Sequence, residues 1–207
     1  PPFGLPDYPG QEVFMHILGY NIDLNNEALK KIMEFLRKER HQRNEKLLAE
    51  LQKLGFHLSP EDLRQRPDQD YVGKPNFAVA LAQKGYIEKP SDAFASRENL
   101  RHPDVLAIKR DKILAKDCIR LIREAGGMAV LAHPMKIPFL GRKKPGYFDR
   151  LSVLLDQLLG WGLHGLECCY NQHSPEETET LIQMARVRGL LITGGSDYHG
   201  PGINRVK

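Results

Sequence analysis

Three short apolar segments, separated by helical patterns, constrain the fold of this chain most. Residues 128–132 form a wholly apolar run, as expected of a strand that is buried on both faces, and 165–170 and 190–193 are the next two strand candidates. Helical patterns over 148–159 and 174–189 connect these strands. Strands that alternate with helices pair in parallel through right-handed crossovers. The sequence therefore predicts an α/β protein with a parallel sheet in its last third.

The remainder of the chain is mainly helical. Residues 12–20 are typical of a strand, and apolar residues recur at helical spacing over 27–54, 75–84 and 113–125. We therefore expect three parts: a barrel strand segment over 1–23, a helical insertion over 24–112, and the C-terminal part of an α/β barrel over 113–207.

Side chains that bind metals follow the predicted strands. In parallel α/β folds, ligands bind at the carboxyl ends of the strands. His133, Asp197 and His199 follow strands there, Glu167 lies within one, and His16 lies in the first strand candidate. Imidazole and carboxylate groups are the ligands that zinc, iron and manganese favour. The convergence indicates a metal centre.

Each of these residues also has a simpler interpretation. Asp197 and His199, two residues apart, fall on the same side of an extended backbone, but a polar turn that closes a strand has the same composition. His133 and His16 are each compatible with a buried neutral histidine in a core. Three interpretations of Glu167 remain: a metal ligand, a hydrogen-bond partner of a metal ligand, or the carboxylate of an ion pair with a lysine.

The long helical pattern is interrupted by arginines. Counting from Leu36 in helical steps reaches Arg40 and Arg43 before Leu47 restores the apolar stripe. An arginine on a buried face needs an anion or a carboxylate. The two arginines form a phosphate clamp, an internal ion pair, or a solvated break between two helices. Lys74, beside a predicted helix start, adds positive charge where anions already bind well.

Composition and the remaining motifs exclude several classes of protein. The net charge of +4 is compatible with an anionic substrate without requiring one. Three cysteines without a C-x-x-C pair are expected to be reduced thiols, which favours a cytoplasmic location. No apolar run approaches the roughly 18 residues that cross a bilayer, so no membrane partner is expected. Glycine-rich nucleotide motifs and the G-x-S-x-G motif are absent from the sequence.

The motifs that carry chemistry resemble those of a known family. Residues 130–134 (VLAHP), 165–167 (GLE) and 193–200 (TGGSDYHG) resemble, in this order, the later motifs of the PHP (polymerase and histidinol phosphatase) family. Residues 16–20, the helical insertion and residues 170–177 resemble a subgroup that hydrolyses nucleoside 3′,5′-bisphosphates and trims short RNA from its 5′ end. The resemblance covers nearly the whole chain.

The resemblance implies a distorted (β/α)7 barrel that holds two or three divalent ions of manganese, iron or zinc. It implies four metal ligands and five substrate contacts. The ligands are His16, His133, Asp197 and His199, of which the last three are also catalytic; the substrate contacts are Arg40, Arg43, Lys74, Asn76 and His173. Where the subgroup has Arg-Pro-His, this chain has Lys74-Pro75-Asn76, which changes the group offered to a phosphate and removes an acid.

The early motifs of the family do not occur in this sequence. Neither H-x-H nor D-H is present. We therefore expect a longer protein, whose N-terminal segment completes the metal site; the alternative is a fragment that lacks several ligands.

The sequence thus predicts a metal-dependent phosphoesterase. Its expected substrates are small phosphorylated molecules, namely nucleoside bisphosphates or the ends of short RNA, which are hydrolysed through a metal-activated hydroxide. A metal-dependent amidohydrolase would use the same ligand types. The third interpretation is an inactive PHP-like module that binds nucleic acid or protein without cleaving it.

Overall fold

The computed structural model describes residues 13–66, 69 and 71–198. Its described residues form two compact units: unit 1 contains residues 13–31 and 113–197, and unit 2 contains residues 32–66, 69, 71–112 and 198. Each unit has a hydrophobic core of its own. Within the described residues, no helix is long and apolar enough to cross a membrane.

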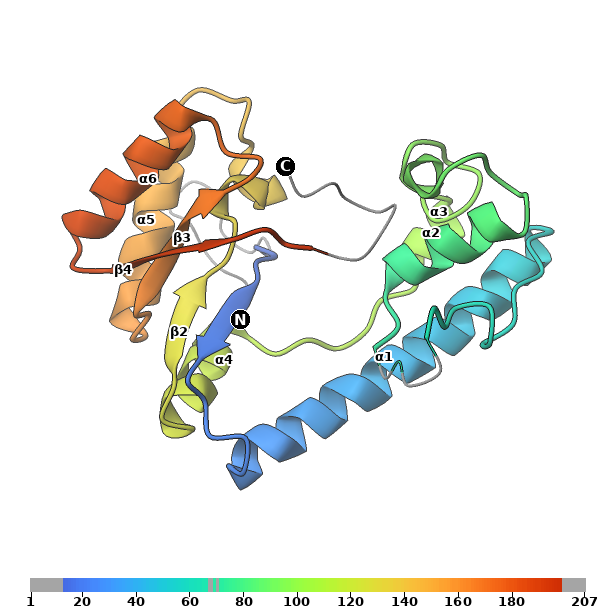
Figure 1. The fold of residues 1–207 in the computed structure, drawn as a ribbon, viewed down its shortest axis with the longest axis horizontal. Coiled ribbons are helices and arrows are strands. Elements are labelled where there is room, and N and C mark those ends of the chain that lie inside the picture. Colours follow the sequence, from blue (N-terminus) through green and yellow to red (C-terminus); the bar gives the residue numbers. More distant parts are fainter. Residues whose placement is uncertain (1–12, 67–68, 70, 199–207) are drawn as a thin grey trace. The chain divides into compact units, whose positions relative to one another are not determined.

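Unit 1 is built on a mixed sheet with the strand order β1-β2-β3-β4 (Figure 1). The strands are β1 (Ile17–Tyr20), β2 (Met128–Leu131), β3 (Gly165–Tyr170) and β4 (Leu191–Gly195). β2, β3 and β4 are parallel, as predicted from the alternation of strands and helices. β1 pairs with β2 in the antiparallel direction, with Ile17 opposite Leu131. The described sheet is therefore mixed.

Three helices pack against this sheet through one apolar core. They are α4 (Ala115–Glu124), α5 (Tyr147–Gly160) and α6 (Pro175–Arg186). α5 contributes four fully buried leucines, Leu151, Leu154, Leu155 and Leu158, at the spacing of one helix face. The core fixes the three parallel strands, and hence the loops that follow them.

The start of α6 follows from its sequence. The Ser174 hydroxyl accepts a hydrogen bond from the backbone N–H of Glu177, and the Glu177 carboxylate accepts one from the N–H of Ser174. This reciprocal pair satisfies two N–H groups that the first turn of a helix leaves without partners.

Unit 2 is helical. Its helices are α1 (Glu27–Lys53), which begins in unit 1, α2 (Lys74–Gln83) and α3 (Pro103–Ala107), with a 3₁₀ turn, η1 (Pro90–Phe94). α1 is continuous through its arginines, so the interpretation as two helices with a break is wrong. Leu47, Leu51 and Phe77 are fully buried in the core of this unit.

A candidate metal centre and a cationic cluster

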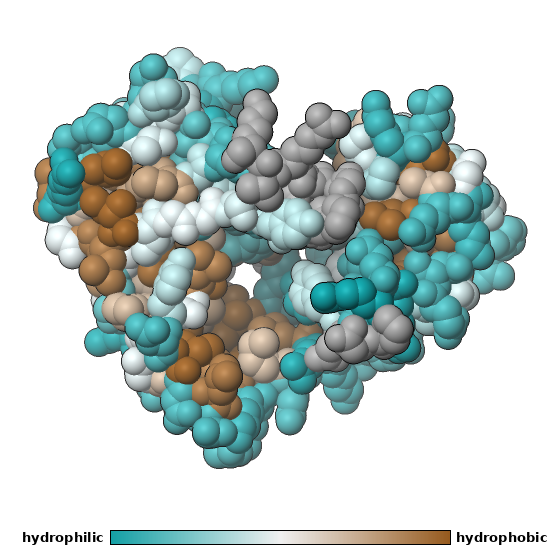
Figure 2. Space-filling model, viewed as in Figure 1, coloured by the Kyte–Doolittle hydropathy of each residue, from teal (hydrophilic) through white to brown (hydrophobic). Residues whose placement is uncertain are grey.

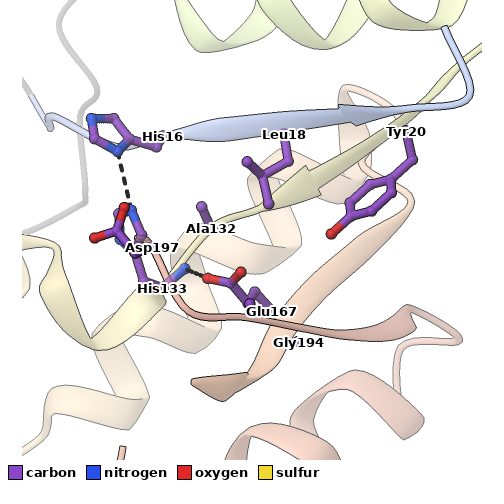
Figure 3. Close-up of a pocket in the computed structure, with 9 residues that line it drawn as sticks. His16, Leu18, Tyr20, Ala132, His133, Glu167, Gly194 and Asp197 are labelled. Carbon is purple, nitrogen blue, oxygen red and sulfur yellow. Dashed lines mark hydrogen bonds between the residues drawn. The ribbon is translucent and has the colours of Figure 1, made fainter. Parts of the chain in front are cut away.

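The rings of His16 and His133 lie against each other at the ends of β1 and β2. His16 directly precedes β1, and its carbonyl oxygen accepts a hydrogen bond from the N–H of Ala132, just after β2. His133 is the next residue. Nδ1 of His16 and Nε2 of His133 are 3.1 Å apart, and the dashed line between these two rings in Figure 3 marks this contact. The antiparallel pairing of β1 and β2 thus brings together two residues that are 117 positions apart in the sequence.

The two nitrogens lie at hydrogen-bonding distance, and both belong to a ligand type that could hold a transition-metal ion. Burial lowers the pKa of His133, more than the Asp197 carboxylate raises it, so the imidazole is neutral at pH 7, the form that binds metals. Its Nδ1 is buried without a hydrogen-bond partner.

Glu167 positions the backbone of His133. One carboxylate oxygen of Glu167, which is 4% exposed, accepts the N–H of His133 at 2.6 Å. His133 has φ of 26°, a left-handed conformation that non-glycine residues rarely adopt. The other carboxylate oxygen lies so close to Gly195 that a Cβ there would overlap it. The Glu167 carboxylate therefore contacts the backbone of His133, whose side chain is a candidate metal ligand.

Asp197 approaches the same pocket from the end of β4. It lines a pocket of about 260 Å³ together with His16, His133 and Glu167. Its Oδ2 accepts a hydrogen bond from Lys136 Nζ at 2.9 Å and one from the Tyr170 hydroxyl at 3.4 Å. Asp197 has φ of 50°, so two of the candidate ligands have a left-handed backbone.

The centre is only partly assembled by these residues. Within the described part of the chain, no three His, Cys, Asp or Glu side chains are arranged to hold a metal ion. His199 lies outside the described residues. The donor set of two imidazoles and a carboxylate fits a transition metal, and further ligands would have to come from other residues.

Lys136 and Tyr170 are neighbours of the site that the sequence did not indicate. Burial lowers the pKa of Lys136, but hydrogen bonds to Tyr170 and Asp197 outweigh it and raise that pKa above its usual value. The Tyr170 ring contacts two histidine rings, His133 in a tilted arrangement at 6.0 Å between centroids and His173 edge-on at 5.1 Å. The one feature of the sequence that could have placed Lys136 at this site is its position three residues after His133.

His173 is the second histidine whose ring contacts Tyr170. Its Nδ1 is 2.9 Å from the carbonyl oxygen of Cys168, and its Nε2 is buried without a hydrogen-bond partner. Burial lowers its pKa, so the ring is neutral at pH 7. The Cys168 carbonyl oxygen and the Tyr170 ring thus hold the His173 ring in place.

Unit 2 carries the other expected substrate residues in a cationic cluster, which comprises Arg40, Arg43, Lys74 and Arg110. Burial, followed by the charges of Arg110 and Arg40, lowers the pKa of Arg43 to about 10. Burial and the charge of Arg43 also lower the pKa of Lys74. The Nε of Arg43 is buried without a hydrogen-bond partner, and the Arg40 guanidinium lies 3.9 Å from the centroid of the Tyr71 ring.

This crowding favours an anion site over an internal ion pair. No described carboxylate forms an ion pair with Arg43. Like charges that are partly removed from water repel each other unless an anion joins them. Asn76 has a structural role nearby: its Oδ1 accepts the N–H of Gly73 at 2.9 Å and caps the start of α2. Sequence reasoning missed Arg110 and Tyr71, which are distant in the chain.

Comparison with known proteins relates the chain to phosphoesterases. No family model matches it. The phosphoribosyl 1,2-cyclic phosphate 1,2-diphosphodiesterase of Eggerthella lenta is 29% identical over 90% of this chain and 66% of its own length. The 3′,5′-nucleoside bisphosphate phosphatase of Chromobacterium violaceum is 26% identical over 96% and 70%. The 5′-3′ exoribonuclease Rnm of Escherichia coli is 25% identical over 90% and 61%. The chain thus spans about two thirds of the length of these relatives.

Two solved structures share the fold. A proposed metal-dependent phosphoesterase from Bifidobacterium adolescentis is 28% identical, with a TM-score of 0.74 over 91% of this chain and 64% of that one. A protein from Chromobacterium violaceum, described as an amidohydrolase with bound sulfate and no metal, is 24% identical, with a TM-score of 0.76 over 91% and 63%. The second likeness concerns the fold alone. By sequence and by fold the chain is a homologue of phosphoesterases, which confirms the resemblance to the PHP family that its motifs carry.

Proposed function

We propose that the protein is a metal-dependent phosphoesterase that acts on nucleoside bisphosphates or on the 5′ ends of short RNA. The observation that carries the proposal is the convergence of His16, His133 and Asp197 on one pocket at the strand ends. The phosphoesterase relatives support the class of reaction, and the bisphosphate phosphatase and exoribonuclease relatives support the class of substrate.

His16, His133 and Asp197 would hold the metal, with His199 as a fourth ligand. A divalent ion there, with manganese as our first choice over iron or zinc and two or three ions in all, would activate water and neutralise phosphate oxygens. Two further residues of the protein would position these metal ligands. Glu167 fixes the backbone of His133, and Tyr170 donates a hydrogen bond to Asp197.

We further propose that the cationic cluster of unit 2 binds a phosphate of the substrate. Arg40, Arg43 and Lys74 supply charge and donors, and the unpartnered Nε of Arg43 is the strongest support for this role. In this proposal unit 2 is a helical insertion in the barrel, and Asn76 and His173 contact the substrate as well.

In this proposal the complete protein is a cytoplasmic (β/α)7 barrel, in which residues other than those described supply the further strands and metal ligands. Part of the apolar surface in Figure 2 lies over the region of α6 and β4. In that region Val187, Leu191 and Ile192 are exposed, and β4 pairs only with β3 among the described strands. An apolar edge strand of this kind is normally covered by another element, and a continued barrel would cover it.

Phosphate release by the full-length protein tests this function. With added manganese, we expect turnover of a nucleoside 3′,5′-bisphosphate and of a short 5′-phosphorylated RNA, but no turnover of a cyclic amide. Asp197→Ala should lose at least about a hundredfold in kcat because the metal loses a ligand. Asp149→Asn, at an exposed position on α5, is the matched control and should retain full activity. Hydrolysis of the amide alone, or an unchanged rate in Asp197→Ala, would contradict the proposal.

A further inference from the structure

Lys136 lies at the candidate metal centre without a role in the function proposed above. It ends the short turn η2 (Pro134–Lys136) that follows His133, and its N–H donates to the His133 carbonyl oxygen at 2.9 Å. Its ammonium is 2.9 Å from Asp197 Oδ2 and 4.9 Å from the centroid of the Tyr170 ring. A turn of fixed geometry therefore ties this cation to two candidate ligands.

Arg142 is a basic side chain of unit 1 whose donors are engaged by the protein itself. The Arg142 guanidinium donates to both carboxylate oxygens of Glu177 and to the carbonyl oxygen of Gln172. Lys136 differs from it in two respects. Its ammonium has three N–H donors, of which the bonds to Asp197 and Tyr170 use two, and its side chain is 32% exposed beside the pocket.

A metal ion at Asp197 would change the acceptor of this ammonium. Two cations that compete for one carboxylate repel each other, and the repulsion is strong where water is partly excluded. The four-carbon stem of lysine is flexible enough to move its head group, which lies 4.9 Å from the centroid of the Tyr170 ring, away from Asp197. The natural acceptor for the displaced ammonium is the anion that enters the pocket.

We propose that Lys136 binds a non-bridging oxygen of the substrate's phosphate group beside Asp197. This inference rests on the phosphoesterase function proposed above. Lys136 pairs with Asp197 while the carboxylate lacks another cation, and it passes to the phosphate once Asp197 holds a metal ion. Lys136 is thus a residue that binds the substrate at the reacting phosphate, and it is not a metal ligand.

The test compares three variants of the full-length, manganese-loaded protein. Lys136→Met removes the charge and keeps the length of the stem, Lys136→Arg keeps the charge, and Lys116→Met, at an exposed position on α4, is the matched control. We expect Lys136→Met to raise KM for a nucleoside 3′,5′-bisphosphate, and the inhibition constant of inorganic phosphate, by about tenfold or more. Lys136→Arg should recover most of this loss, and Lys116→Met should match the wild type.

Manganese affinity, measured by competition with a chelator, provides a readout independent of activity. Lys136→Met should bind manganese at least as tightly as the wild type, because a competing cation is gone. A tenfold weaker affinity for manganese with normal phosphate inhibition would make Lys136 a residue that orients Asp197, and the inference would be wrong. Unchanged KM and phosphate inhibition in an active Lys136→Met protein would also overturn it.

The same variants separate this inference from the proposed function. If the wild-type protein hydrolyses no phosphate ester, the proposed function is wrong. Calorimetry of inorganic phosphate binding to the manganese-loaded protein would still test the contact between Lys136 and phosphate. Loss of that binding in Lys136→Met but not in Lys136→Arg would support the phosphate contact. Equal binding by all variants would refute it.

Discussion

At the scale of single residues, Arg43 is expected to lower the stability of the folded protein while it contributes to substrate binding. Its pKa is lowered by burial and by two neighbouring arginines, so the folded protein bears a cost of crowded charge. Arg43→Gln should leave the free energy of unfolding unchanged or raise it, because the repulsion is relieved. The same change should raise KM for a bisphosphate by about 10- to 100-fold, since a charge-assisted hydrogen bond is lost.

Urea unfolding and steady-state kinetics measure the two effects of Arg43→Gln together. Arg64→Gln, at an exposed position in the same unit, is the control and should change neither quantity. A destabilised Arg43→Gln protein with a normal KM would mean that the cluster is a structural ion pair.

Glu167 allows a second test with single residues. Glu167→Ala leaves the N–H of His133 buried without an acceptor, which should lower the free energy of unfolding by about 1–3 kcal/mol. Glu167→Gln keeps an oxygen in place and should lose less. Chemical denaturation measures both, with Glu179→Ala as an exposed control that should cost under about 0.5 kcal/mol. Equal losses for Glu167→Ala and Glu179→Ala would show that the contact is unimportant.

Single residues also show what a sequence can reveal about such a site. His133 and Asp197 were predicted because each follows an apolar strand, and strands of one parallel sheet end at the same edge. The contact between His16 and His133 depends on an antiparallel pairing that the local pattern of residues 12–20 did not specify. The contacts of Lys136 and Glu167 depend on side-chain direction, which the spacing of residues does not encode.

At the scale of elements, the close approach of β3 and β4 makes a glycine necessary. A Cβ at Gly195 would overlap the Glu167 carboxylate, whereas a Cβ at Gly160, near the end of α5, would meet nothing within 4 Å. Gly195→Ala should therefore destabilise the protein by about 1–3 kcal/mol. Gly160→Ala should be neutral or stabilising by up to about 1 kcal/mol, because alanine favours the helix. Thermal unfolding of both variants checks this, and an equally stable Gly195→Ala protein would contradict the packing described.

Elements with a strong local pattern were predicted well. The long helix over 27–54 is α1 (Glu27–Lys53), and the capping residues of 174–177 do begin α6. The 3₁₀ turn η1 and the five-residue helix α3 were missed, since such short elements carry no periodicity. The strand expected over 12–20 is limited to β1 (Ile17–Tyr20) within the described residues, because only those positions pair with β2.

At the scale of the whole molecule, the proposed function depends on residues drawn from distant parts of the chain. β1, β2 and β4 each bring one candidate ligand to the pocket of unit 1, and α1 and α2 bring cations to the cluster of unit 2. The α/β class and the phosphoesterase relationship could be predicted from motifs and their order. A closed barrel could not be derived from the described strands, because they pair in the open order β1-β2-β3-β4.

Metal content is the measurement that tests the central claim most directly. Purified full-length protein, analysed for manganese, iron and zinc by mass spectrometry, should contain two or three equivalents. His133→Ala should lose at least one of them, while His57→Ala, which removes an exposed histidine of unit 2, should keep them all. Equal metal content in the wild type and in His133→Ala, or a wild-type protein that binds no metal when it is supplied, would contradict the claim that His133 and its neighbours form a metal centre.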